Sequence, residues 1–135
     1  MKKSKGFSLI ELIVVITIIA VITAVGTVSF STTNKKARDG RRLADLEKIR
    51  MSLEVMRQVG TTYPGSLPVL APTYLNAVPV GPSQDTYLYT QGATRYTYTL
   101  DAWMELQTPN IDPPAGSCGT VGGVAVTCNY RVQQP

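Results

Sequence analysis

Two cysteines, Cys118 and Cys128, are the side chains of this sequence best suited to covalent chemistry. In an oxidising compartment they would form a disulfide, which would close a short loop and stabilise a small domain by roughly 3 kcal/mol. In the cytosol they would stay as two free thiols. A structural zinc site is disfavoured, because zinc takes four nitrogen or sulfur ligands and the sequence contains no histidine. The choice between disulfide and thiols depends on whether the chain is exported.

The acidic side chains do not form the pattern of a catalytic or metal site. No histidine is present to act as a general base, and no glycine-rich loop is present to hold a phosphate. Asp101 and Glu105 are four residues apart, but beside Trp103 they resemble residues at a strand end or in a turn. Asp85, Asp101 and Asp112 lack the spacing of a calcium-binding loop. We therefore expect no catalytic residue, no metal and no cofactor.

One further acid, Glu11, lies inside the most apolar segment of the chain. This segment runs from Phe7 to Phe30 and follows three lysines and Gly6. At about 1.5 Å per residue, a helix of this length spans roughly 36 Å, enough to cross the ~30 Å hydrocarbon core of a bilayer. A carboxylate at mid-membrane costs roughly 2.5 to 3.5 kcal/mol on insertion scales, and less near an end. The presence of Glu11 therefore calls for a specific role.

Two interpretations of this amino-terminal segment differ in where the chain is cut. An ordinary secretory signal peptide would be cut after a small-residue pattern such as Ala24-Val25-Gly26, which would remove the apolar segment. A cut between Gly6 and Phe7 would instead leave the apolar helix on the mature protein. The apolar run is longer than the usual signal core of about 7 to 15 residues and contains a carboxylate, so the second interpretation is favoured.

The residues Lys5-Gly6-Phe7-Ser8-Leu9-Ile10-Glu11 resemble the class III signal of type IV pilins and type II secretion pseudopilins. The resemblance implies that a prepilin peptidase cuts after Gly6 and that the new terminal residue, Phe7, is N-methylated. It also implies that Glu11 pairs with the amino terminus of a neighbouring subunit. The spacing of four residues also allows Glu11 to pair with the Phe7 amine of its own chain. The proline that many family members carry later in this helix is absent from Val25–Val28.

Basic residues gather after the apolar segment. The whole chain has 13 basic and 9 acidic residues, a formal charge of +4. The cluster consists of Lys35, Lys36, Arg38, Arg41 and Arg42. It could contact DNA or anionic lipid headgroups, or it could be the solvated part of a stem. Five basic residues after the segment and three before it would hold the remainder in the cytoplasm by the positive-inside rule. The signal and the cysteines predict the opposite, and we follow them.

The region after the apolar segment predicts an amphipathic helix. Its apolar side chains recur every three or four residues and form one stripe, made of Leu43, Leu46, Ile49, Leu53 and Met56. The polar stretch Ser29–Asn34 predicts a hinge before this helix. Alternatively the two segments form one long helix with weak points at Gly26 and Gly40. Gly60 predicts the end of the helix.

The remaining residues predict a connecting loop followed by short strands. Five prolines within residues 63–82 exclude a long regular element and leave room for one helical turn near Tyr74. Alternating tyrosines predict a hairpin of Thr86–Thr90 and Arg95–Leu100 around a turn at residues 91–94. The tyrosines could stack on single-stranded nucleic acid or glycan, but at strand spacing they more often cover a core.

Two further strands are expected nearer the carboxyl end. Trp103–Leu106 predicts a short strand. The stretch Val124–Val132 alternates regularly between apolar and polar residues and predicts a longer one, with Cys128 on its apolar face. A bridge from Cys128 to Cys118 would fasten the proline- and glycine-rich segment before Cys118 to the sheet.

These patterns predict an α+β chain in which a long amino-terminal helix packs on a small antiparallel β-sheet head. We expect residues 1–6 to be a leader and 7–30 a transmembrane assembly helix. Residues 31–59 would form the amphipathic half of the helix, and 60–135 a β-rich head with a disulfide loop.

The resemblance implies a structural subunit of a type IV pilus or pseudopilus and not an enzyme. Its helix would cross the cytoplasmic membrane once, with the head outside, before the subunit joins a filament at the cell surface or in the periplasm. Its partners would be copies of itself, other pilins, prepilin peptidase, an assembly platform and membrane lipid. The alternatives are a minor pilin or pseudopilin that binds DNA for uptake or serves protein secretion, and a conventionally secreted or membrane-anchored domain.

Overall fold

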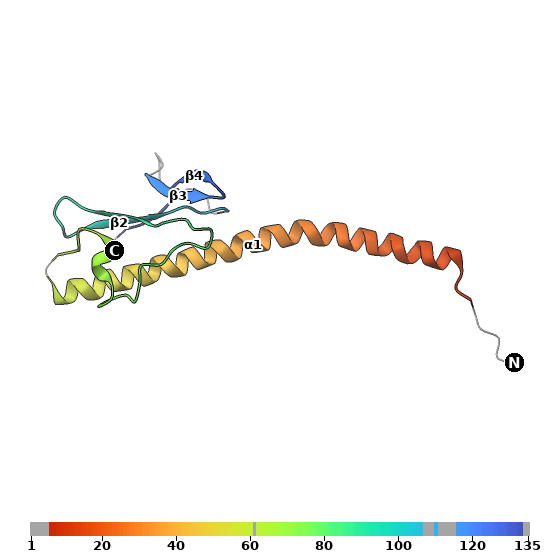
Figure 1. Cartoon of the computed structure of the whole chain (residues 1–135), viewed down its shortest axis with the longest axis horizontal. Coiled ribbons are helices and arrows are strands. Elements are labelled where there is room, and N and C mark those ends of the chain that lie inside the picture. Colours follow the sequence, from red (N-terminus) through yellow and green to blue (C-terminus); the bar gives the residue numbers. More distant parts are fainter. Residues whose placement is uncertain (1–5, 61, 107–109, 111–115, 134–135) are drawn as a thin grey trace. The chain divides into compact units, whose positions relative to one another are not determined.

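A computed structural model of the chain describes residues 6–60, 62–106, 110 and 116–133, and of residues 27–29 the backbone alone. The chain divides into two units, Met1–Lys35 and Lys36–Pro135. Helix α1, Leu9–Val59, contributes its first part to one unit and its second part to the other (Figure 1). All described strands belong to the second unit and pair antiparallel. The predicted α+β chain with a long helix and small antiparallel sheets is confirmed.

The backbone of α1 is helical through the whole of Ser29–Asn34, so the prediction of a hinge that separates two helices is wrong. This stretch contains no proline, and its serine and threonine residues lower helix propensity only slightly. Gly60 marks the end of the helix as expected, and its N–H donates to the Met56 carbonyl at 2.8 Å.

In the first unit, the apolar side chains of α1 are exposed along the helix. By length and composition this helix contains one stretch that could cross a membrane, and that stretch is unburied. Two hydroxyls of this helix are paired within it, since Thr17 and Thr23 donate to the carbonyls of Val14 and Ile19 at 2.8 and 2.7 Å. Such internal pairing reduces the cost of placing a hydroxyl among apolar residues.

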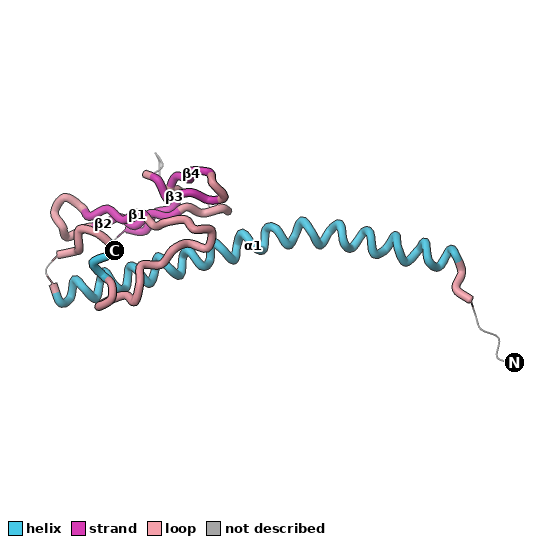
Figure 2. The backbone as a smooth tube through the Cα atoms, viewed as in Figure 1, coloured by secondary structure: helices cyan, strands magenta, loops and turns pink. Residues whose placement is uncertain are grey.

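In the second unit, the carboxyl-terminal part of α1 supplies the core through the predicted stripe. Leu46, Ile49 and Leu53 are buried, and Leu43 and Met56 are partly buried beside them. The strands lie over this part of the helix (Figure 2). The strands contribute Tyr98, Leu100 and Ala102 to the same core. Tyr87, the residue before the first strand, joins them, so the tyrosines at strand spacing serve largely as core residues.

The proline-rich connection contains a short 3-10 helix, η1, Leu67–Leu70. The predicted helical turn near Tyr74 thus lies a few residues earlier in the chain. Tyr74 itself closes the following turn by donating its N–H to the Leu70 carbonyl at 2.8 Å. Buried Leu67 and Leu70 anchor this connection to the core.

The larger sheet of the described residues has three strands, β1 Leu88–Gln91, β2 Tyr98–Ala102 and β5 Tyr130–Gln133, in the order β1-β2-β5. Gln91 pairs with Tyr98, so the predicted hairpin is correct but its connection covers residues 92–97 and not 91–94. Arg95 explains the difference. It has a φ of 59°, a left-handed conformation that an extended strand does not use.

The predicted strand Trp103–Leu106 does not form, because side chains take the backbone groups that a neighbouring strand would use. The Asn129 amide accepts from the Met104 N–H at 2.6 Å and donates to the Met104 carbonyl at 2.8 Å. The N–H groups of Glu105 and Leu106 both donate to the Asp39 carboxylate, each at 2.9 Å. Strand β2 therefore ends at Ala102.

The stretch predicted as one strand over Val124–Val132 is split between two sheets. Its first part is β4, Val124–Thr127, which pairs with β3, Ser117–Val121, across a Gly122-Gly123 turn. Its second part belongs to β5. The chain changes partner at Cys128 and Asn129, whose N–H groups donate to Gly116 and Ala102. Regular alternation describes a strand locally but does not determine with which strand it pairs.

Candidate functional site

The Gly6-Phe7 peptide bond precedes the helix. The backbone of both residues is non-helical, both are exposed, and Phe7 keeps 80% of its surface accessible. Helix α1 begins at Leu9, and the Ser8 carbonyl accepts from the N–H groups of Glu11 and Leu12 at 3.1 and 3.2 Å. The bond that the sequence predicts to be cut therefore lies on exposed, irregular backbone. The predicted leader otherwise lies outside the described residues.

Glu11 occupies the first turn of α1 and is exposed. The amino-terminal end of a helix carries a partial positive charge, which favours a carboxylate at this place. Among the described residues Glu11 forms no salt bridge. Its position is thus compatible with pairing to an amine, either that of a neighbouring chain or that of Phe7 in its own.

The five predicted basic contacts do not form one exposed surface. Lys36 and Arg41 are exposed and Lys35 is half-buried. Arg38 and Arg42 are instead engaged by acids of the head, and Arg42 has no accessible surface. An external anion would have access to Lys36 and Arg41 but not to the Arg42 guanidinium.

Arg42 is the centre of a buried ion cluster, which we define as Arg38, Asp39, Arg42, Asp85 and Glu105. Its guanidinium donates to the Asp85 carboxylate through Nε at 2.8 Å and Nη2 at 3.1 Å. Its Nη1 donates to Asp39 at 2.9 Å and to Glu105 at 3.2 Å. Burial alone would lower the pKa of Arg42, but the hydrogen bonds and charge of these acids raise it overall. The guanidinium is therefore held in its charged form.

Arg38 completes the cluster at its more exposed side. Its Nε and Nη2 each donate to one Glu105 oxygen at 2.6 Å, a bidentate arrangement. This pairing, with a further contribution from Arg42, holds the pKa of Glu105 below its ordinary value. The cluster thus joins α1 to two segments of the head, one before β1 and one after β2.

The sequence predicts these arginines as surface groups and does not identify the partners Asp39, Asp85 and Glu105. One signal was present in the spacing. Arg42 precedes Leu46 by four residues and Ile49 by seven, so it lies on the same helical face as the apolar stripe. A charge at a core position indicates a buried partner, but helical spacing alone does not identify that partner.

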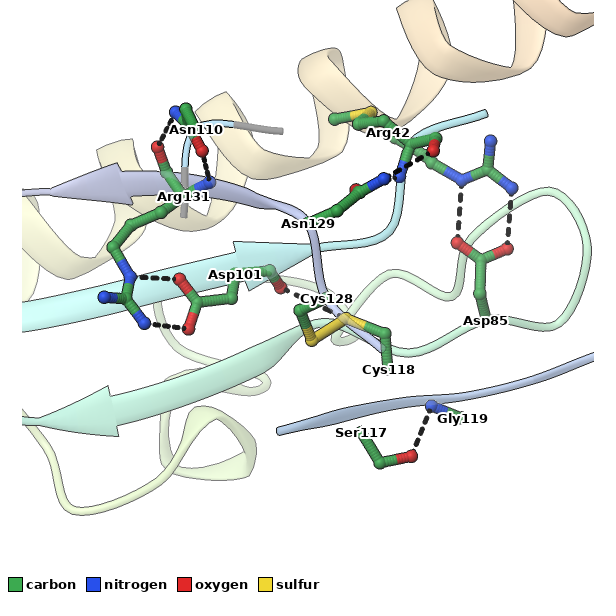
Figure 3. Close-up of a disulfide and its surroundings, with 11 residues drawn as sticks. Arg42, Asp85, Asp101, Asn110, Ser117, Cys118, Gly119, Cys128, Asn129 and Arg131 are labelled. Carbon is green, nitrogen blue, oxygen red and sulfur yellow. Dashed lines mark hydrogen bonds and ion pairs between the residues drawn. A yellow bond between two sulfur atoms is a disulfide. The ribbon is translucent and has the colours of Figure 1, made fainter. Parts of the chain in front are cut away.

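The disulfide adjoins the segment that carries Asp85, because the Cys118 carbonyl accepts from the N–H of Thr86 at 2.9 Å. Cys118 and Cys128 are both buried and bonded, with their sulfur atoms 2.09 Å apart (Figure 3). Asp101, in β2, accepts a bidentate pair of hydrogen bonds from Arg131 at 2.6 and 2.9 Å.

The described residues contain no group of acids or cysteines arranged to hold a metal ion. Asp112 lies outside the described residues.

Comparison with known proteins identifies the amino-terminal segment. The family model of the prokaryotic N-terminal methylation motif matches residues 1–27. This motif is the class III signal, which is typical of type IV pilins and pseudopilins. No curated protein and no solved structure matches the chain.

Proposed function

We propose that this protein is a structural subunit of a type IV pilus or pseudopilus that assembles through the first part of α1. The observation that carries the proposal is the match of the N-terminal methylation motif to residues 1–27. Two structural features support it. The Gly6-Phe7 bond lies on exposed backbone, and the helix that follows presents unburied apolar side chains. Prepilin peptidase would cut after Gly6, and the new Phe7 terminus would be methylated.

Before assembly, the apolar part of α1 would lie in the cytoplasmic membrane with the head on the outer side. In the filament it would exchange contacts with lipid for contacts with the helices of neighbouring copies. The Glu11 carboxylate would pair with the Phe7 amine of a neighbour. Because an isolated carboxylate is unfavourable among apolar groups, this pairing would select one register between subunits.

Mass spectrometry of the mature amino terminus tests the processing step. We expect a chain that begins with methylated Phe7. A chain that begins at Thr27, or one that retains Met1, would show that the protein is a conventionally secreted or membrane-anchored domain.

Glu11→Ala tests the assembly step. We expect the variant to be inserted and cut normally but to give fewer filaments by electron microscopy. Glu47→Ala, which removes an exposed acid from the second unit, is the matched control and should leave the yield unchanged. A normal yield from Glu11→Ala would exclude a role of this carboxylate in assembly.

The contacts do not favour the alternative in which the basic cluster captures DNA. Two of its five residues already bind carboxylates of the same chain. We therefore do not propose DNA binding as a second function.

A further inference from the structure

The disulfide adjoins both head segments that supply acids to Arg42. Asp85 lies in the segment before β1 and Glu105 in the segment after β2, so the two acids reach Arg42 from different parts of the chain. Each segment is held by a residue at or next to one of the two cysteines. The contacts on each side are direct hydrogen bonds.

On the first side, Cys118 holds the segment that carries Asp85. The carbonyl of Cys118 accepts from the N–H of Thr86, the residue after Asp85, at 2.9 Å. The two backbones are close here, since a Cβ atom on Gly119 would lie 3.5 Å from the backbone nitrogen of Thr86. Strand β3 therefore fixes the backbone next to Asp85.

On the second side, the residue after Cys128 holds the segment that carries Glu105. Asn129 donates its backbone N–H to Ala102 at 3.0 Å, and its side-chain amide binds both backbone groups of Met104. Met104 immediately precedes Glu105. Figure 3 shows Asn129, the disulfide and the Arg42-Asp85 pair in one view.

We propose that the Cys118–Cys128 disulfide is a redox-sensitive brace that holds Asp85 and Glu105 at the separation that the buried Arg42 guanidinium requires. Arg42 has no accessible surface, so its charge is compensated only while its acids are in place. A buried charge that loses one partner is strongly destabilising, because its desolvation is no longer offset. Reduction would therefore release the ion cluster before it disrupts the rest of the core.

Formation of the brace is an ordinary thiol–disulfide exchange. One cysteine thiolate attacks a disulfide of an external oxidant, which forms a mixed disulfide and releases one thiol. The second cysteine thiolate then attacks the mixed disulfide at the sulfur of the first cysteine, which releases the second thiol. The two cysteines lose two protons and two electrons, and the oxidant, a protein or small-molecule disulfide, becomes two thiols.

The expectation that the disulfide forms outside the cytoplasm rests on the proposed function, which puts the head there. The ion cluster would then assemble only after export. The coupling between disulfide and cluster does not depend on filament assembly, and it is measured on the purified full chain in detergent micelles. If the disulfide and the cluster proved not to be coupled, the proposed function would be unaffected.

Urea unfolding of the oxidised and the phosphine-reduced chain measures the coupling. The single tryptophan, Trp103, is the reporter, because its ring lies 4.8 Å from the Arg42 guanidinium carbon. We expect Asp85→Asn to lower the folding equilibrium constant about a hundredfold or more in the oxidised chain, but only about threefold or less in the reduced chain. Tyr63→Phe, which removes a core hydroxyl outside the cluster, should have the same effect in both states. Equal effects of Asp85→Asn in the two states would overturn the proposal.

Hydrogen exchange in the reduced chain without urea provides a second measurement that does not need a folding transition. We expect the amides of Thr86 and Glu105 to lose protection while those of Leu53 and Leu100 keep it. Simultaneous loss at all four would show that the disulfide stabilises the whole head without a specific link to the cluster. Unchanged protection at Thr86 and Glu105 would equally overturn the brace.

Discussion

Arg42 and Asp85 form a bidentate ion pair across 43 residues of sequence, with donor–acceptor distances of 2.8 and 3.1 Å. Figure 3 shows the two hydrogen bonds of this pair, and both side chains are fully buried. The pair joins the amphipathic part of α1 to the segment that leads into β1. Asp39 and Glu105 complete the environment of the guanidinium, so the head closes on the helix through charged as well as apolar contacts.

Removal of the Arg42 side chain should destabilise the head strongly. Arg42→Ala leaves buried acids without their partner, and changes of this kind cost about 3 to 5 kcal/mol. Urea unfolding of the full chain in micelles, followed by Trp103 fluorescence, measures the loss. Arg50→Ala is the control, because Arg50 forms a more exposed pair with Glu47, and such pairs contribute only about 0.2 to 1 kcal/mol. A comparable cost for the two variants would show that the buried cluster is not a major source of stability.

A methyl group at Gly81 should disturb the same ion pair by displacing the Asp85 carboxylate. A Cβ atom there would overlap the Asp85 carboxylate and would lie 2.6 Å from its Oδ1 atom. We expect Gly81→Ala to cost about 1 to 3 kcal/mol, the range for an overpacked interior. Gly65→Ala is the matched control, because nothing lies within 4 Å of the added atom. Thermal unfolding compares the midpoints of the two variants. Equal midpoints would contradict the close approach of Gly81 to the Asp85 carboxylate.

Stability should fall in acid through Glu105. The pKa of Glu105 is lowered in the folded state, chiefly by the hydrogen bond from Arg38. Its contribution is therefore complete above the ordinary glutamate value of about 4.3 and is lost as the pH falls below it. Glu105→Gln should be less stable than the native chain at pH 7 and should lose less stability on acidification. Urea unfolding between pH 7 and 3 tests this, and parallel curves for the two proteins would refute it.

Stability should also fall in base through Tyr89. Burial raises the pKa of Tyr89 to about 12, and its hydroxyl donates to the Pro64 carbonyl at 2.7 Å. The unfolded chain releases this proton near pH 10, so the contribution is present below about pH 10 and is lost as the pH rises toward 12. Tyr89→Phe should show a smaller loss of stability between pH 9 and 11. The same slope in both proteins would mean that Tyr89 does not contribute to the alkaline transition.

Local patterns predicted those parts of the fold that depend on neighbouring residues. The stripe from Leu43 to Met56, the helix end at Gly60 and the β1-β2 hairpin follow from periodicity and from a single glycine. The same reasoning failed at Ser29–Asn34, where weak polar signals did not interrupt the helix. It also failed at residues 103–106, where the acceptors Asp39 and Asn129 come from elsewhere in the chain.

The sequence by itself determined the amino-terminal signal, the apolar helix behind it and the amphipathic character of the helix that follows. These properties depend on residues that are neighbours in sequence, so they can be recognised without knowledge of the fold. The tertiary structure alone decided that Asp85 and Glu105 are the acids that neutralise Arg42, and that Val124–Val132 divides between two sheets. Each of these depends on contacts between segments far apart in sequence, and local spacing holds no information about which segments meet.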